Sequence, residues 1–362
     1  MAVSMIVEQD VPIPMRDGTL TYANVLRPAT GRHPVLLCRT SYGKDKRKAE
    51  FNTLDPVRAV QRGYAVVIQD VRGRFASEGR FDPFVQEIED GYDSVEWCAA
   101  QPWSTGQVAM YGRSYLGATQ WLAALAKPPS LRAIAPGVTA SNYYEGWTYQ
   151  GGALQLAFAL AWAAYSLSLG NFGRLARTLD DAAAQRARLW QAVHDLPAAW
   201  RFAPLRAWPV LERLAPYYYE WLDHPAYDDY WRRTAIKEHY GRLDLPTFNY
   251  GGWFDVFAMG TVENFAGMRG QAPGHGRDSR LLMGPWSHTT LPQNYLGERH
   301  FGALGSADAI DLDGWQLRFF DYWLKGMDDG WSEEPPVRLF VMGANTWRSE
   351  HEWPLARTEW TR

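Results

Sequence analysis

Short apolar runs alternate with helix-like segments along the first part of the chain, and this alternation constrains the fold more than any other feature of the sequence. Runs typical of buried strands lie at 33–39 (HPVLLCR), 65–69 (AVVIQ), 108–111 and 133–136. Helical spacing marks the segments between them, at 57–62, 90–100 and 114–126. Strands and helices that alternate at these lengths form βαβ units around a largely parallel sheet. The sequence therefore predicts an α/β fold with helices on both faces of the sheet.

The alternation breaks near Ser141 and resumes with strands predicted at 245–250 and 280–283. The residues between are helical in pattern and rich in Trp and Tyr, which predicts a helical insertion into a sheet domain. A last apolar strand, VRLFVM at 337–342, has no obvious partner, and an unpaired apolar edge is unfavourable. The predicted parts are a sheet core at 1–141 and 241–334, a helical cap at 142–240, and the start of a third, β-rich domain at 335–362, most of it absent.

The composition narrows the class of partner. The 362 residues are 46% apolar and 21% charged, which is ordinary for a globular protein of about two folding units. The net charge of -3 comes with no long basic run, so a nucleic-acid surface is not expected, and KDKRK at 44–48 is expected to be a solvated loop. The stretch 146–173 has no charge and is long enough to span a membrane. Its Gln, Ser and Gly residues favour a buried helix of the insertion instead.

The cysteines and the N-terminus bear on the compartment. Cys38 and Cys98 are the two cysteines of the chain, and both sit among apolar residues. Buried thiols fit a reducing cytoplasm better than a disulfide does. The first residues, MAVSM, carry neither a basic region nor a long apolar core, so no signal peptide is expected. These two features predict a cytoplasmic protein. No metal-binding or phosphate-loop motif is present, so we predict that the protein has no metal or cofactor.

A serine between a predicted strand and a predicted helix is the first candidate for chemistry. The segment GRSYLG at 112–117 places Ser114 on that turn. A serine in this position forms a nucleophile elbow, in which small residues relieve a crowded turn and the helix N-terminus favours negative charge beside the serine oxygen. The usual form is G-x-S-x-G, but here Leu116 replaces the second glycine, which comes one position late. A glycine-rich turn around a serine is also common as a structural feature.

An acid and a histidine follow Ser114 at matching positions. Asp255 (in GGWFD) and His288 (in GPWSH) each come just past the end of a predicted strand. The order Ser, Asp, His at the C-terminal ends of strands is that of α/β-hydrolases. Asp255 alone would also suit a helix N-cap, and His288 alone a loop. The other histidines late enough in the chain to compete as the base are His239, His275 and His300.

These residue types together suit acyl transfer. Serine needs a base within hydrogen-bond reach, histidine supplies one near neutral pH, and aspartate holds the histidine tautomer and stabilises the imidazolium. The backbone N–H of Tyr115, the residue after the nucleophile, is expected to donate to the oxyanion. A second donor is expected from the loop RTSYG at 39–43.

The sequence at this point resembles the X-Pro dipeptidyl-peptidase (CocE/NonD) family of α/β-hydrolases, and within it the cocaine esterase group. The resemblance covers essentially the whole chain. It rests on several long motifs in one order: PMRDGTLTYANVLRP, RTSYGKDK, QDVRGRFASEGRF, MYGRSYLGATQW, GGWFDVF, LLMGPWSH and VRLFVMGANTWR. The elbow of this family, G-x-S-Y-x-G, also accounts for the late glycine.

The resemblance implies an α/β-hydrolase core, an inserted helical cap and a C-terminal jelly-roll domain, of which this sequence holds only the beginning. By position, Ser114 matches the family nucleophile, Asp255 the acid and His288 the base. Tyr42 matches the tyrosine whose hydroxyl helps form the oxyanion hole. The residues that match the aromatic lining of the acyl pocket are Trp147, Trp162 and Phe257.

These expectations lead to a function. We predict a serine esterase that hydrolyses small-molecule carboxylic esters through an acyl-enzyme. Flat aromatic rings stack on aromatic groups, so the acyl part is expected to be aromatic or bulky and apolar. We expect neither nucleic acid nor a membrane as a partner, and a homo-oligomer stays open.

Two alternatives also stay open. An X-Pro dipeptidyl aminopeptidase or an α-amino acid ester hydrolase of the same family would hold a substrate amine with carboxylates near the nucleophile. From Ser141 to Gly173 the single acid is Glu145, which weighs against this alternative. A non-catalytic binding module that keeps the fold is the second alternative, since fold does not imply function.

Overall fold

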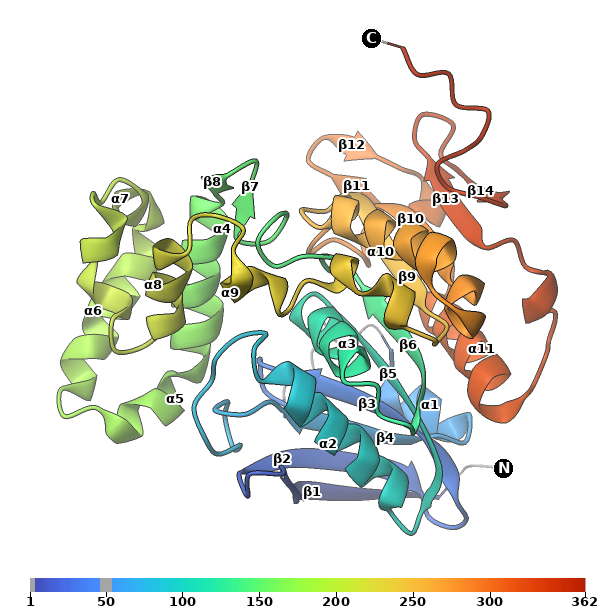
Figure 1. Ribbon diagram of the computed structural model, residues 1–362, viewed down its shortest axis with the longest axis horizontal. Coiled ribbons are helices and arrows are strands. Elements are labelled where there is room, and N and C mark those ends of the chain that lie inside the picture. The colour runs from blue at the N-terminus through green and yellow to red at the C-terminus, as the bar shows by residue number, and fades with distance from the viewer. Residues whose placement is uncertain (1–3, 46–53, 362) are drawn as a thin grey trace.

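The computed structural model describes residues 4–45 and 54–361 and has a ten-stranded sheet at its centre (Figure 1). Its strands are β1 (Met5–Pro14), β2 (Leu20–Pro28), β3 (His33–Thr40), β4 (Ala65–Asp70), β5 (Ser104–Arg113), β6 (Leu131–Gly137), β9 (Phe248–Phe254), β10 (Arg280–Ser287), β13 (Val337–Val341) and β14 (Thr346–Glu350). They lie in the order β1-β2-β4-β3-β5-β6-β9-β10-β13-β14. Neighbours from β4 to β13 are parallel, and the pairs at the two edges are antiparallel.

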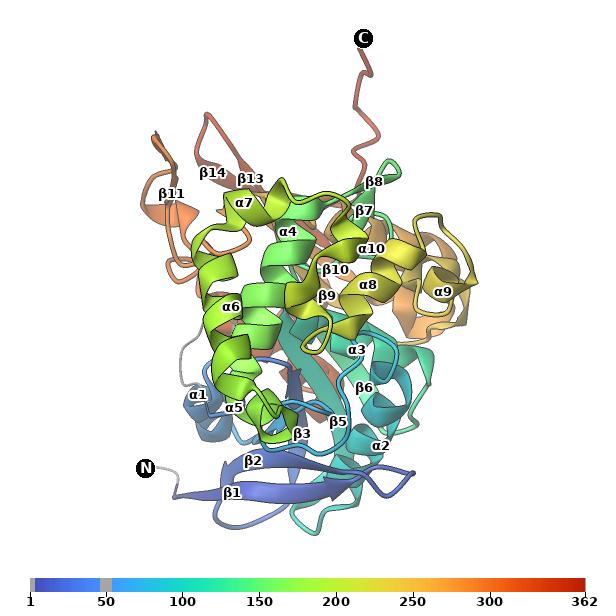
Figure 2. The ribbon, with the colours of Figure 1, turned by 90° about the vertical axis from the view of Figure 1, so that its left-hand side faces the viewer.

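The middle of the sheet is buried because both of its faces are covered. All six residues of β4 and seven of the eight in β3 are buried, which is why both strands have continuous apolar sequences. Helices α2 (Glu87–Ala100), α3 (Tyr115–Leu125) and α10 (Ala258–Gln271) cover one face. Helix α1 (Pro56–Gln61) covers the other face (Figure 2), together with α11 (Leu312–Lys325), to which the ion pair Arg58–Asp311 joins it. The predicted α/β fold is confirmed.

The insertion between β6 and β9 is helical, as predicted, and its helices gather at one end of the sheet, at the left of Figure 1. Its α-helices are α4 (Leu156–Ala161), α5 (Phe172–Leu175), α6 (Ala182–His194), α7 (Leu196–Trp200), α8 (Pro216–Asp223) and α9 (Asp229–Arg232). A π-helical turn, η1 (Trp162–Ser168), continues α4. Besides its helices the insertion has one short hairpin that the helical pattern of the sequence did not predict, formed by β7 (Tyr149–Gln150) and β8 (Ala153–Leu154). Strands of two residues are too short to give a readable alternation.

Short elements complete the chain. They are the hairpin of β11 (Tyr295–Leu296) with β12 (Arg299–His300), and the 3-10 turns Leu169–Asn171, Ala176–Thr178, Leu205–Ala207, Pro209–Leu211, Ile236–Glu238, Tyr240–Arg242, Gly274–Asp278, Ala303–Gly305 and Trp331–Glu333.

One helical run of the insertion passes a composition test for a membrane span. The run Leu156–Thr178 is long and apolar enough to cross a bilayer, and half of its most apolar window is buried inside the protein. It includes much of the uncharged stretch for which a buried helix was predicted. Trp162, Ala163, Ala164 and Leu167 are among its buried residues, so the run has a packed place within the fold.

The strand β13 has partners, contrary to the expectation from the sequence. It pairs in parallel with β10, where Val337 lies opposite Leu281, and antiparallel with β14. The sequence of β14, TWRSE, is polar and mostly exposed, so it has no apolar pattern that would reveal a partner strand. The segment predicted to open a third domain therefore extends the main sheet as far as Glu350.

The charged run at 44–48 is also corrected in part. Lys44 is not solvated: its side chain is 2% exposed, and its ammonium lies 2.7 Å from Asp10 and 3.2 Å from Asp45. The aliphatic part of the Lys44 side chain is buried, and its ammonium group pairs with carboxylates. The composition of the sequence does not reveal such pairing. Residues 46–48 lie outside the described part of the chain.

Close packing of α2 on α3 gives a testable prediction. A Cβ at Gly91 in α2 would stand 2.5 Å from the Cβ of Ala123 in α3. We expect Gly91→Ala to lower the free energy of unfolding by about 1–3 kcal/mol in urea titrations, because the two helices must separate. In the matched control Gly270→Ala, in α10, nothing lies within 4 Å of the added Cβ. That change should raise stability by about 0.5–1 kcal/mol, because alanine favours the helix. Equal effects of both changes would contradict the close packing.

Candidate active site

Ser114 occupies a strained turn between β5 and α3. Its backbone has φ 60° and ψ -126°, a region that costs a non-glycine residue about 1–3 kcal/mol. Hydrogen bonds hold it there: its N–H donates to the Gly137 carbonyl at 2.9 Å, and its carbonyl accepts from Gly117 at 2.9 Å and Ala118 at 3.0 Å. Such backbone strain at the residue that precedes a helix is what a nucleophile elbow requires.

The late glycine of the elbow has a packing role. A Cβ on Gly117 would stand 2.9 Å from the Cβ of Thr139 and 3.0 Å from the Gly137 carbonyl oxygen. Helix α3 can therefore approach the end of β6 only because this position has no side chain. The glycine predicted from the sequence as out of place is the one that the contact requires.

The three residues predicted as nucleophile, base and acid lie in one hydrogen-bonded chain. His288 Nε2 is 2.8 Å from Ser114 Oγ, and His288 Nδ1 is 2.9 Å from Asp255 Oδ2. Asp255 follows β9 and His288 follows β10, so neighbouring parallel strands deliver acid and base to the same edge of the sheet. The competing histidines are elsewhere: His275 contacts Asp278, His300 accepts from the Gly302 N–H, and His239 lies between the 3-10 turns Ile236–Glu238 and Tyr240–Arg242.

Asp255 and His288 differ in burial in a way that suits the chemistry of the hydrogen-bonded series. The Asp255 side chain is fully buried, and its second oxygen accepts the Phe257 N–H at 2.6 Å, which fixes the carboxylate. The His288 side chain is 21% exposed, so a substrate or water can approach its Nε2. With the Nδ1 proton donated to Asp255, Nε2 is left as an acceptor for the Ser114 hydroxyl.

Tyr42 lies beside Ser114, as the resemblance implied. It follows β3 by two residues and is 5% exposed. Burial raises the pKa of its phenol, while the hydrogen bond from Trp162 and the nearby Ser41 and Ser114 hydroxyls act in the opposite direction. The phenol therefore stays protonated at neutral pH, and its hydroxyl is within the reach of Ser114. It can serve as a donor to an oxyanion formed there.

Hydrogen bonds of its buried side chain hold Tyr115 in place. Its backbone N–H opens helix α3, and the first N–H groups of a helix have no partner within it. Its side chain donates to Glu87 at 2.8 Å and accepts the Phe84 N–H at 3.2 Å. Glu87 is in turn paired with the buried Arg39 at 2.7 Å. This buried pair anchors the residue that follows the nucleophile and was not singled out from the sequence.

The three aromatic residues expected in an acyl pocket come together next to the triad. The ring centroids of Phe257 and His288 are 5.1 Å apart, and Trp147 stacks on Phe257 with a centroid distance of 4.2 Å. Trp162 lies 5.3 Å from Trp147 and donates a hydrogen bond to Tyr42 at 3.0 Å. Two rings of the same cluster that the sequence did not reveal are Phe84 and Phe158.

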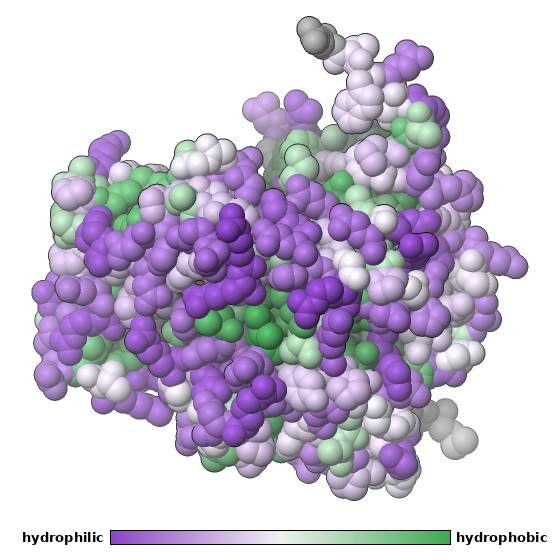
Figure 3. Space-filling view, in the orientation of Figure 1, coloured by the Kyte–Doolittle hydropathy of each residue, from purple (hydrophilic) through white to green (hydrophobic). Residues whose placement is uncertain are grey.

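These rings belong to the seam between cap and core. On the face seen in Figure 3, hydrophobic residues gather where the cap helices meet the core, within a mainly hydrophilic surface. A buried cation, Arg74, crosses the seam: it donates to the carbonyls of Ser41 at 2.7 Å and Leu167 at 2.6 Å. Arg74 lies in the motif QDVRGRF, which was quoted for the resemblance without a role for this residue.

The carboxylate that the sequence left as a candidate amine ligand is not at the site. Glu145 is exposed, and its side chain accepts the Gly151 N–H at 3.0 Å in the small hairpin of the cap. Within residues 4–45 and 54–361 no cluster of three or more His, Cys, Asp or Glu side chains could hold a metal ion.

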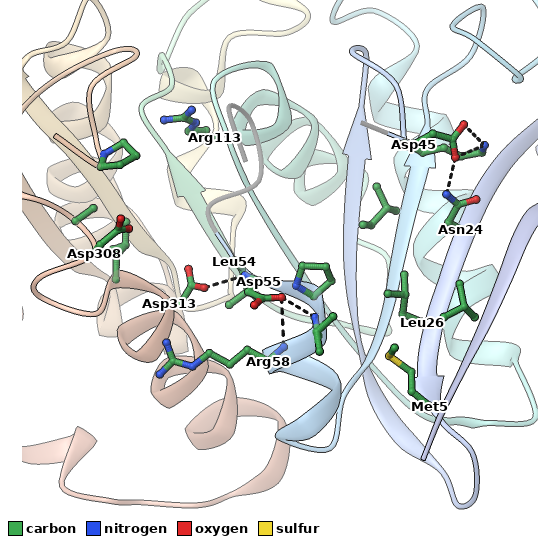
Figure 4. Close-up of a pocket in the computed structure, with 18 of the residues that line it drawn as sticks. Met5, Asn24, Leu26, Asp45, Leu54, Asp55, Arg58, Arg113, Asp308 and Asp313 are labelled. Atoms are coloured by element: carbon green, nitrogen blue, oxygen red, sulfur yellow. Dashed lines mark hydrogen bonds and ion pairs between the residues drawn. The ribbon is translucent and has the colours of Figure 1, made fainter. Parts of the chain in front are cut away.

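A separate cavity of about 990 Å³ opens between β1, β2, α1 and the start of α11 (Figure 4). Asn24, Asp45, Arg58 and Asp313 lie on its walls. Arg113, the neighbour of the nucleophile, also reaches it, but the triad residues do not line it. The chemistry of Ser114 therefore faces the cap–core seam rather than this cavity.

Comparisons with known proteins show the family of this chain. The sequence model of one protein family, X-Pro dipeptidyl-peptidase (S15 family), matches residues 17–290 of this chain. The cocaine esterase of Rhodococcus sp. (strain MB1 Bresler) is 37% identical over 359 residues, which make up 98% of this chain and 61% of that protein. The chain thus spans about three fifths of the length of this curated relative.

Solved structures show the same fold. A CocE/NonD family hydrolase from Staphylococcus aureus is 25% identical, with a TM-score of 0.69 over 99% of this chain and 58% of the other. An aminopeptidase from a marine sediment archaeon, Thaumarchaeota archaeon, is 24% identical, with a TM-score of 0.70 over 97% of this chain and 59% of the other. The second likeness concerns the fold alone.

The place of Tyr42 gives a prediction. We expect Tyr42→Phe to reduce kcat for p-nitrophenyl acetate by the equivalent of about 2.7–4 kcal/mol, because the hydroxyl is lost and the ring remains. Stopped assays over a range of substrate concentrations would separate kcat from KM. Tyr165→Phe removes a hydroxyl from an exposed cap tyrosine and serves as the control. An unchanged kcat in Tyr42→Phe would remove this residue from the oxyanion hole.

Proposed function

The chain belongs to the X-Pro dipeptidyl-peptidase (S15) family, and from that premise we propose that it is a serine esterase acting on small carboxylic esters. The observation that carries the proposal is the continuous chain Asp255–His288–Ser114, with gaps of 2.9 and 2.8 Å, on a strained elbow. A histidine held by a carboxylate and touching a serine hydroxyl is the arrangement that activates serine for acyl transfer.

The first half of the proposed reaction forms an acyl-enzyme. Ser114 Oγ attacks the ester carbonyl while its proton passes to His288 Nε2, and Asp255 stabilises the imidazolium. The carbonyl oxygen gains negative charge and accepts hydrogen bonds from the Tyr42 hydroxyl and the Tyr115 backbone N–H. The C–O bond to the alcohol then breaks, the alcohol takes the proton from Nε2, and the acyl group stays on Oγ.

The second half repeats the same steps with water. His288 Nε2 accepts a proton from a water molecule as that water attacks the acyl carbonyl. The oxyanion again forms next to Tyr42 and Tyr115. When the bond to Oγ breaks, the proton returns to Ser114 and the carboxylic acid leaves. The 21% exposure of the His288 side chain supports this access for water.

We propose that the acyl group is aromatic or bulky and apolar. The rings of Trp147, Trp162 and Phe257 form one cluster that reaches both His288 and Tyr42. Rigid rings bury much apolar area and favour aromatic partners. The relative named cocaine esterase fits an ester substrate. The exposed position of Glu145 disfavours the aminopeptidase and amino-acid ester alternatives.

The division into parts is proposed along the same lines. The core at 1–141 and 241–334 would carry Ser114, Asp255 and His288, and the cap at 142–240 would carry Trp147 and Trp162. Both cysteines are buried thiols, and burial raises the pKa of each, which suits the cytoplasmic location proposed for the protein.

Removing the nucleophile tests the proposal directly. We expect Ser114→Ala to reduce kcat for p-nitrophenyl esters by about four to six orders of magnitude, because only binding and the oxyanion donors remain. Ser349→Ala, on the exposed face of β14, is the matched control and should leave kcat unchanged. Circular dichroism should show both variants folded. Turnover by Ser114→Ala at the level of the control would reject the proposed function.

The acyl preference has its own test. We expect Trp147→Ala to lower kcat/KM for phenyl benzoate about tenfold more than for phenyl acetate, because only the larger acyl group reaches the removed ring. Trp190→Ala truncates an exposed tryptophan of cap helix α6 and should leave the ratio of the two esters unchanged. Equal losses on both esters in Trp147→Ala would mean that the ring only packs the cap.

A further inference from the structure

Trp162 makes a contact that lining an acyl pocket does not require. Its indole Nε1 lies 3.0 Å from the Tyr42 hydroxyl oxygen. The two side chains come from different parts of the chain, 120 residues apart, and are 6% and 5% exposed. A hydrogen bond shielded from water in this way is stronger and more directional than one on the surface.

The direction of this hydrogen bond determines where the Tyr42 proton can point. An indole N–H only donates, so the Tyr42 oxygen is the acceptor. The single proton of the phenol is therefore directed away from Trp162, and the Ser114 hydroxyl is among the groups that interact with the phenol oxygen. The donor expected of an oxyanion hole is thereby oriented before a substrate arrives.

The same hydrogen bond gains strength during the reaction. As the carbonyl oxygen of a substrate becomes negative, the hydroxyl that donates to it takes on negative charge at its own oxygen. A second donor to that oxygen then stabilises the transition state more than the ground state, since chained hydrogen bonds polarise one another. Trp162 stands at the far end of such a chain.

The cap holds Trp162 firmly in this place. The residue begins the π-helical turn η1, a rare element that often marks functional positions. Arg74 from the core binds the Leu167 carbonyl of that turn at 2.6 Å and the Ser41 carbonyl next to Tyr42 at 2.7 Å. On its other side Trp162 stacks on Trp221 of α8, with centroids 5.7 Å apart and planes within 5°.

We propose that Trp162 is a positioning residue of the oxyanion hole, which holds the Tyr42 hydroxyl with its proton toward Ser114. The cap thus completes the catalytic centre in addition to shaping the acyl pocket. This inference rests on the proposed esterase function.

The experiment removes the indole N–H and keeps an aromatic ring. In Trp162→Phe we expect kcat for phenyl acetate to fall about tenfold with KM unchanged, as for the loss of one buried hydrogen bond. Acetate is too small to need the acyl pocket, so a residue that only lines the pocket would leave this kcat unchanged. Replacement of Trp162 by 3-benzothienylalanine, which has sulfur in place of the N–H, should give the same loss even if the smaller phenylalanine disturbs folding.

A double-mutant cycle tests the link to Tyr42. In the Tyr42→Phe background, Trp162→Phe should cause no further loss of kcat, because the oxygen that it serves is gone. Trp190→Phe is the matched control: it makes the same change at an exposed tryptophan of cap helix α6, so kcat for phenyl acetate should stay at the wild-type level.

The outcomes separate this inference from the function on which it rests. If the wild-type chain has no esterase activity that depends on Ser114, the proposed function fails and the inference fails with it. If the wild type is active, but Trp162→Phe and the benzothienyl variant keep full activity on acetate, the inference alone is overturned. Losses that multiply fully in the Tyr42→Phe background overturn it as well.

Discussion

The backbone of Ser114 is the constraint on which the rest of the site depends. A non-glycine residue at φ 60° is stable only where its surroundings hold it. Here the end of β6 accepts its N–H, and the close approach of α3 to Thr139 needs the missing side chain of Gly117. Because the neighbouring strands are parallel, β9 and β10 end on the same edge of the sheet and bring Asp255 and His288 to the same point. The triad is a consequence of this sheet edge rather than an addition to it.

Two buried arginines stabilise the residues around this edge of the sheet in different ways. Arg39 pairs with Glu87, which anchors the Tyr115 side chain under the elbow. Arg74 binds backbone carbonyls on both sides of the cap–core seam, and burial lowers its pKa to about 10. It therefore remains charged at neutral pH. A guanidinium suits both tasks, because its fork of donors can satisfy several oxygens at once. Removing either partner of the Arg39–Glu87 pair would leave a buried charge uncompensated, which is far costlier than losing a surface pair.

Much of this arrangement could be predicted from the sequence, and the parts that could not share a physical reason. Apolar runs mark β3, β4 and β5 because both faces of these strands are buried, and the order of Ser114, Asp255 and His288 follows from the strand ends. The polar strand β14 was missed, since an exposed edge strand needs no apolar pattern, and Lys44 was misjudged because one of its carboxylate partners, Asp10, is distant in sequence. The contact of Trp162 with Tyr42 was likewise invisible: both residues were singled out, but for separate roles. Hydrogen bonds between elements 120 residues apart leave no local signal.

In the proposed function, the seam between cap and core joins substrate choice to rate. Trp147 and Phe257 stack on each other next to His288, so in the proposed acyl pocket they would meet the acyl group from the side of the base. Trp162 belongs to the same ring cluster but also bonds to Tyr42 on the side of the oxyanion. A change at Trp147 can reshape the pocket and leave the oxyanion donors in place. A change at Trp162 alters pocket and donor together, because one indole supplies both the ring and the N–H. Replacing Trp147 with a smaller residue would thus enlarge the proposed pocket for bulkier esters and keep the full catalytic rate. At Trp162 the same enlargement would keep the rate only where the new side chain still donates to the Tyr42 oxygen.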